Sequence, residues 1–196
     1  MPVNRSVPDV AEKRKNWNSL MSGFKASDLV FLDESDCNTD MTRRYAYSLG
    51  GSRAVDSAPL SKPKNTTILS SIQLDGTRRY TTFSGGTTVE RFKRYLETDL
   101  LPHLNGNSVL VMDNMKSHHA KAVKKLLDSS GVRYIYLPPY SPDLNPIEKL
   151  WSKVKAFLRK FKARTLDALP NAIQNDFQSV SPSDCSGWFK FCDYLH

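Results

Sequence analysis

The second half of the chain alternates apolar strand patterns with a helical one, and this alternation constrains the fold more than any other feature. Residues 109–112, Val-Leu-Val-Met, form a short apolar run closed by Asp113. Residues 120–127 have helical spacing and stop near Gly131, and residues 132–137 form a second apolar run stopped by two prolines. A strand, a helix and a strand in succession imply parallel pairing of the strands. This half therefore predicts an α/β fold.

The first half predicts antiparallel pairing instead. Residues 29–32 read as a buried strand that ends at Asp33, because a short unbroken apolar run closed by acidic residues suits a central strand. Residues 43–49 and 65–74 suggest two further strands, and residues 79–83 return from an Asp-Gly turn as a hairpin partner. We expect an α/β fold with a mixed sheet, antiparallel first strands then parallel strands, flanked by helices.

The chain divides into three predicted segments. Residues 1–28 are a polar lead-in, residues 29–164 hold the strands, and residues 165–196 form a C-terminal helical tail. Apolar residues at helical spacing predict further helices at residues 10–24, 89–101 and 145–161.

Charge and cysteine content restrict the partners and the compartment. The chain has 28 Lys and Arg against 20 Asp and Glu, a formal net charge of +8. This excess favours a polyanionic partner, nucleic acid first, although a solvated basic face is the alternative. The three cysteines form no CxxC pair, and their odd number argues against a disulfide framework. No apolar run is long enough to span a bilayer, so we predict a cytoplasmic protein with no membrane contact.

Two aspartates, Asp33 and Asp113, each directly follow an apolar strand pattern. Ligand groups of open α/β sheets collect at the carboxyl ends of strands, so neighbouring strands would bring these two acids together. Mg²⁺ and Mn²⁺ prefer oxygen ligands, and two such ions can stabilise the attacking and leaving oxygens of a phosphoryl transfer. The alternative is that both residues only close strands in turns. Glu34, Asp36 and Asp40 compete for the role of Asp33.

Glu148 is the third candidate acid, at the end of a proline-rich segment that leads into the last long helix. A structural interpretation competes here. Asn145 is a good helix N-cap, Pro146 suits the first helical position, and Glu148 falls where the acid of a capping box belongs.

Three sequence blocks together carry a family resemblance. They are Val30-Phe31-Leu32-Asp33-Glu34-Ser35, Val111-Met112-Asp113-Asn114 with His118, and the segment from Leu137 to Glu148. Their order, and the 34 residues that separate Asp113 from Glu148, resemble the DDE transposases of the mariner superfamily. Within it the chain is most similar to the bacterial insertion-sequence-630 group.

The resemblance implies an RNase H-like DDE catalytic domain over residues 29–164. It implies that Asp33, Asp113 and Glu148 are the catalytic residues and hold two Mg²⁺ ions, for which Mn²⁺ can substitute. The expected reaction is cut-and-paste transposition: cleavage of DNA at element ends, then transfer of the freed 3′ ends into target DNA. Expected partners are both DNAs and a second copy of the chain, in a bacterial, nucleoid-associated setting.

Asn114 and His118 are expected to support this site by orienting water or contacting phosphate. For His118 the alternative is an ordinary surface or capping residue. The four histidines have no zinc-binding spacing with the cysteines.

Basic residues follow Glu148 along one flank of the last long helix. Lys155, Arg159 and Lys162 recur there at helical spacing. We predict that they contact the phosphate backbone of the cleaved strand, and the alternative is a solvated basic face. Trp151 is expected to be core.

One departure from the family pattern concerns DNA recognition. Full-length relatives carry helix-turn-helix units before the catalytic domain, and only 28 residues precede the first strand here. A separate helix-turn-helix chain is therefore an expected partner. The alternatives are a truncated or repurposed DNA-binding protein without catalysis, and another RNase H-like nuclease. The 34-residue interval and the proline-rich block argue against the latter.

Overall fold

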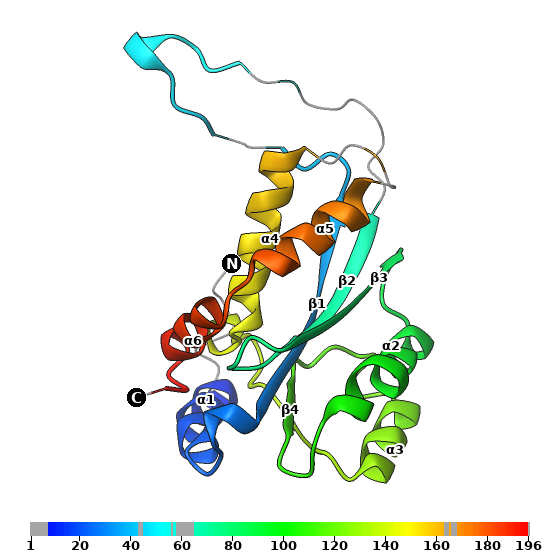
Figure 1. The fold of residues 1–196 in the computed structure, drawn as a ribbon. Helices are drawn as coiled ribbons and strands as arrows, with labels where there is room; N and C mark the ends of the chain where they lie inside the picture. Colours follow the sequence, from blue (N-terminus) through cyan, green and yellow to red (C-terminus); the bar gives the residue numbers. More distant parts are fainter. Residues whose placement is uncertain are drawn as a thin grey trace.

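The computed structural model describes residues 8–42, 45–55, 57, 65–162, 165 and 168–195. It contains a five-stranded sheet (Figure 1). The strands are β1 (Leu29–Asn38), β2 (Asn65–Ile72), β3 (Arg78–Ser84), β4 (Val109–Met112) and β5 (Arg133–Tyr136). Their order is β3-β2-β1-β4-β5, with β1, β2 and β3 antiparallel and β1, β4 and β5 parallel. The predicted mixed sheet is confirmed.

Six α-helices accompany the sheet in the described part of the chain. They are α1 (Pro8–Met21), α2 (Val89–Tyr95), α3 (Lys121–Ser130), α4 (Ile147–Phe161), α5 (Ala168–Ser179) and α6 (Pro182–Phe191). α2 continues through a π turn and a 3-10 turn as far as His103. Among the described residues, no helix has the length and apolar character needed to cross a membrane.

The helices cover the two faces of the sheet unequally (Figure 1). Phe31 and Val111 face a core shared with α1, α4, α5 and α6, whereas Leu32 and Met112 face a core shared with α2 and α3. Alternate residues of a strand point to opposite faces, so the paired segments Leu29–Leu32 of β1 and Val109–Met112 of β4 are apolar throughout because both faces are covered there. Trp17 of α1 and Phe189 of α6 belong to the same core as Phe31.

Two strand predictions need correction. β1 does not end at Asp33 but continues to Asn38, because its second half keeps a partner in β2 after the pairing with β4 has ended at Leu32. The strand predicted over residues 43–49 is wrong in its described part, since residues 45–48 form no strand and Leu49 begins a 3-10 turn. Residues 45–55 project from the body (Figure 1), where Tyr45 and Tyr47 are fully exposed and gain nothing from a sheet. Residues 43 and 44 lie outside the described residues.

Candidate active site

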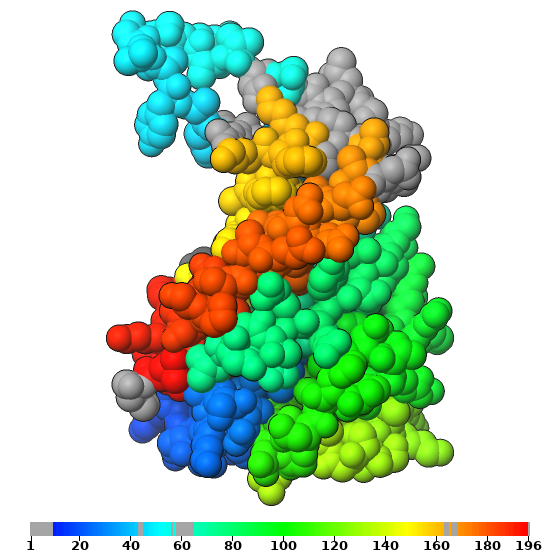
Figure 2. Space-filling model, in the orientation of Figure 1, coloured from blue at the N-terminus to red at the C-terminus, as the bar shows by residue number. Residues whose placement is uncertain are grey.

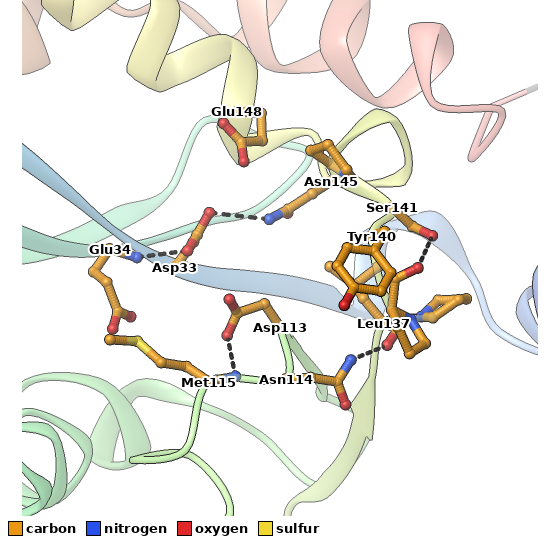
Figure 3. Close-up of a pocket in the computed structure, with 13 residues that line it drawn as sticks. Asp33, Glu34, Asp113, Asn114, Met115, Leu137, Tyr140, Ser141, Asn145 and Glu148 are labelled. Atoms are coloured by element: carbon orange, nitrogen blue, oxygen red, sulfur yellow. Dashed lines mark hydrogen bonds between the residues drawn. The ribbon is translucent and has the colours of Figure 1, made fainter. Parts of the chain in front are cut away.

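The register of the two central strands brings Asp33 and Asp113 together. Leu32 of β1 pairs with Met112 of β4 in parallel, and an aspartate follows each of these two residues, so the pairing places Asp33 beside Asp113. Both aspartates follow the alternation of Phe31 and Val111 and therefore point toward the face that α4 covers. They line one cavity of about 620 Å³, and Glu148 in the first turn of α4 lines it too (Figure 3). The structure thus gathers the three predicted acids at one place.

Asp33 is the most deeply buried of the three acids. Only 7% of it is exposed. Its Oδ1 accepts a hydrogen bond from the Glu34 amide at 2.7 Å, and its Oδ2 accepts from Asn145 Nδ2 at 3.2 Å and Trp151 Nε1 at 3.3 Å. Burial, and then the charges of the Asp113 and Glu148 carboxylates, raise the pKa of Asp33 to about 8. The repulsion among these three carboxylates favours a bound cation, which would stabilise the ionised form of Asp33.

Asp113 is held in its ionised form by a neighbouring imidazole. Its Oδ1 accepts from the Met115 amide at 2.9 Å and lies 2.8 Å from His118 Nδ1. Burial alone would raise the pKa of Asp113, but the hydrogen bond and charge of His118 lower it below its ordinary value on balance. Asp113 is therefore the acid best prepared to act as an anionic ligand.

His118 lies behind Asp113, fully buried. Its Nε2 is 3.1 Å from Glu34 Oε2, and its ring stacks on Phe92 at 4.2 Å between centroids. Burial opposes protonation, but the hydrogen bonds to Asp113 and Glu34 raise the pKa of His118 to about 9. An imidazolium can donate to both carboxylates at once. The alternative of an ordinary surface residue is wrong for His118, which orients Asp113.

The capping interpretation of Glu148 is also wrong. No side chain caps the start of α4, which follows Pro146. Asn145 turns its amide toward Asp33 instead of the helix N-terminus. The Glu148 side chain lines the cavity and is partly withdrawn from solvent, and this burial raises its pKa although the charge of Lys155 opposes the rise.

Two residues that position Asp33 were not predicted from the sequence. Trp151 is buried, as predicted, but its indole also donates to Asp33. Asn145 was predicted only as a cap, although its relative exposure is just 3%. Spacing offered a signal, because Trp151 lies one helical turn after Glu148 on the same flank.

The donor set fits a hard divalent cation. Besides the three carboxylates, Glu34 Oε1 and Asn145 Oδ1 are buried, line the cavity and have no hydrogen-bond partner among the described residues. All of these candidate ligand atoms are oxygens, which Mg²⁺ prefers. As they stand, no three acidic, histidine or cysteine side chains of the described chain are gathered closely enough to coordinate an ion. The carboxylates of Asp33 and Asp113 accept hydrogen bonds from neighbouring N–H groups, so they must move closer together to coordinate one ion.

The competing acids lie elsewhere or have other partners. Asp36 is exposed and accepts a hydrogen bond from Thr67 on β2 at 2.6 Å. Asp40 lies beyond the end of β1. Glu34 lines the cavity but points to His118. Asn114 donates from its side-chain amide to the Leu137 carbonyl, which ties the end of β4 to the segment after β5.

The basic flank of α4 contains two of its three predicted members. Lys155 and Arg159 are partly exposed. Both lie near Cys37 of β1, since burial raises the pKa of this thiol to about 11 and the charges of both cations oppose that rise. Lys155 is also near enough to Glu148 for its charge to oppose the rise in the pKa of that carboxyl group. α4 ends at Phe161, and Lys162 adopts a left-handed conformation (φ 55°) just past the helical flank. A role in DNA binding stays a prediction for all three.

Comparisons with known proteins agree with this fold. The fold is RNase H-like: the catalytic domain of Mos1 mariner transposase superimposes with a TM-score of 0.74 at 16% identity, covering 99% of this chain and 93% of that one. A pre-cleavage Mos1 transpososome gives a TM-score of 0.81 at 21% identity, covering 99% and 64%. The chain belongs to the DDE superfamily endonuclease family, whose model matches residues 28–170.

Two curated relatives are transposases of nematodes. The Tc1 transposase of Caenorhabditis elegans is 28% identical over 47% of this chain and 36% of that protein. The Tcb2 transposase of Caenorhabditis briggsae is 32% identical over 38% of this chain and 28% of that protein. The chain therefore matches about a third of the length of these relatives.

Proposed function

We propose that this chain cuts DNA strands at the ends of a mobile element and transfers the freed 3′ ends into target DNA. One observation carries the proposal: Asp33, Asp113 and Glu148 line a single cavity within a DDE endonuclease fold. The family match supports metal-dependent phosphoryl transfer, and the 34-residue interval between Asp113 and Glu148 supports a mariner-superfamily DDE transposase. The finer assignment to the bacterial insertion-sequence-630 group is proposed on the resemblance of the three sequence blocks.

Asp33, Asp113 and Glu148 would hold two Mg²⁺ ions, with Mn²⁺ as a substitute. When bound, such ions activate water and stabilise the attacking and leaving oxygens of an in-line displacement. Mos1 complexes with Mg and with Mn are known. The surrounding residues keep the ligands in place: Asn145 and Trp151 hold one oxygen of Asp33, and His118 holds Asp113.

A strand-cleavage assay tests the proposal. Duplexes that carry the inverted repeats flanking this reading frame would be incubated with the protein, alone and with a chain containing a helix-turn-helix unit. We expect nicked and joined products with Mg²⁺ or Mn²⁺, and none after chelation by EDTA. Lack of any product with both metals, in the presence of such a chain, would overturn the proposal.

Lys155 and Arg159 are proposed to hold the backbone of the cut strand. Charge reversal of a residue that binds one phosphate should reduce the slope of log affinity against log salt by about one. We therefore expect Lys155→Glu with Arg159→Glu to weaken binding to short duplexes and to flatten its salt dependence. Lys93→Glu with Lys125→Glu, on α2 and α3, is a control of equal charge change. Equally weakened binding in both variants would mean that only net charge matters.

The partners of the whole protein are proposed from the family match and from the similar Mos1 structures. We infer a homodimer on DNA, since Mos1 forms paired-end complexes. A separate helix-turn-helix chain would supply recognition of the element ends.

A further inference from the structure

A proline-rich loop, residues 138–146, connects β5 to α4 and sets the position of two site residues. It carries Asn145, which donates to Asp33, and it leads directly to Glu148. Its own backbone hydrogen bonds include those of one 3-10 turn, from the Leu144 amide to Ser141 and from the Asn145 amide to Pro142. Tyr140 has φ 57°, a conformation that is costly for a residue other than glycine. Contacts from elsewhere in the chain must hold such a loop in place.

One such contact comes from α1. Arg14 donates to both carboxylate oxygens of Asp143, with Nη2 2.6 Å from Oδ2 and Nη1 3.2 Å from Oδ1. Arg14 Nη1 also donates to the Ser141 hydroxyl, which in turn donates to the Pro139 carbonyl at 3.1 Å. A planar guanidinium that meets a carboxylate with two hydrogen bonds fixes orientation as well as distance.

A second contact comes from the C-terminal turn after α6. Tyr194 donates its hydroxyl to the Leu144 carbonyl at 2.6 Å, immediately before Asn145, and accepts from Trp17 Nε1 of α1 at 2.9 Å. The Tyr194 ring packs on Phe31 at 4.9 Å between centroids, two residues before Asp33. The N-terminal (blue) and C-terminal (red) parts of the described chain adjoin in Figure 2, and the hydrogen bonds of Arg14 and Tyr194 bring both to this loop.

We propose that Arg14 and Tyr194 are positioning residues for the metal site. They hold the loop from outside the cavity, and so set how closely Asn145 and Glu148 approach the two aspartates. Removal of either interaction lets the loop relax away from Asp33, which weakens divalent-metal binding before any DNA is present. The inference rests on the proposed function, because it assigns the cavity to a metal.

Mn²⁺ binding to the DNA-free protein, followed by electron paramagnetic resonance well below the unfolding temperature, tests this role. Tyr194→Phe removes only the hydroxyl, and Arg14→Gln removes only the charged fork. We expect each to weaken Mn²⁺ binding about tenfold, the usual lower range for residues that orient ligands. Asp143→Asn breaks the same ion pair as Arg14→Gln. The double variant with both substitutions should therefore bind Mn²⁺ no more weakly than either single variant.

Tyr134→Phe is the matched control, because the Tyr134 hydroxyl makes a similar side-chain hydrogen bond to Asp128 at the end of α3. It should keep the parental Mn²⁺ affinity. Variants that melt earlier but bind Mn²⁺ like the parent would reduce both residues to a structural role and overturn the inference. A parent that binds no Mn²⁺ overturns both proposals. If the parent binds Mn²⁺ but cuts no DNA, the proposed function fails, while weaker binding in the variants still supports the positioning role.

Discussion

Replacing Asp113 with asparagine is expected to reduce metal-dependent strand cleavage by about a thousandfold, the scale on which lost electrostatic stabilisation of a transition state acts. The amide keeps the shape of the side chain but loses the charge that a divalent ion needs. DNA binding should persist, because the basic residues of α4 are unchanged. Product formation on labelled duplexes, together with a filter-binding measurement, separates the two effects.

The same substitution should lower the unfolding temperature, with a defined pH dependence. It removes a charge-assisted hydrogen bond from buried His118, worth about 1–3 kcal/mol in general and nearer the lower value here, since the Asp113 side chain is 44% exposed. The pKa of His118 is raised from 6.5 to about 9, so the stabilisation is fully present below pH 6.5 and is lost as the pH rises through 9. The pKa of Asp113 is lowered from 3.8, so the stabilisation is present above that pH and is lost under more acidic conditions.

Thermal melts across the pH range check this prediction. The difference between parent and Asp113→Asn should be largest between about pH 4 and 6.5 and should close above pH 9. Asp36→Asn, on the exposed side of β1, is the control and should retain cleavage. A variant at position 113 that still cuts like the parent would contradict the assignment of Asp113.

Replacing Glu148 with glutamine is expected to reduce cleavage by about a hundredfold or more, yet to leave the protein as stable as the parent or more so. No side-chain cap is lost, because none is formed at the start of α4. Burial raises the pKa of Glu148, so its ionised form is disfavoured by folding and a neutral amide avoids that cost. The gain in unfolding temperature should increase as the pH rises, since more of the parental carboxylate is then ionised.

Glu90→Gln provides the opposite case. Glu90 lies in the first turn of α2, where hydrogen bonds with the backbone and with Thr88 lower its pKa. We expect this variant to cleave normally and to melt slightly earlier. If Glu148→Gln instead melted early and kept its activity, Glu148 would be a structural residue at a helix start, as the capping interpretation holds.

The position of Asp33 and Asp113 could be predicted because it follows from local patterns. Each residue directly follows an apolar run, and parallel pairing in register places such residues side by side. The end of β1 could not be predicted in this way, because its polar half is a strand only through its pairing with β2. The exposed segment from Tyr45 shows the converse, since a strand-like composition forms no strand without a partner.

The residues that orient the acids were beyond reach of sequence patterns because their contacts cross large intervals of the chain. Asn145 and Trp151 meet Asp33 across 112 and 118 positions, and His118 meets Glu34 across 84. A good N-cap residue was available at position 145, but its amide donates to Asp33 instead, because a buried carboxylate that lacks hydrogen-bond donors is costly. The long-range requirement therefore outweighed local propensity.

The sequence alone determined the mixed sheet and the place of Asp33 and Asp113 after two of its strands, since these depend on periodicity and on residues adjacent in the chain, whereas Glu148 was chosen through the family resemblance. Only the tertiary structure decided that His118 is a buried partner of Asp113, that Asn145 serves Asp33 and that Arg14 and Tyr194 hold the loop before α4. The physical reason is that hydrogen bonds and ion pairs depend on distance in space, which packing of the helices on the sheet sets.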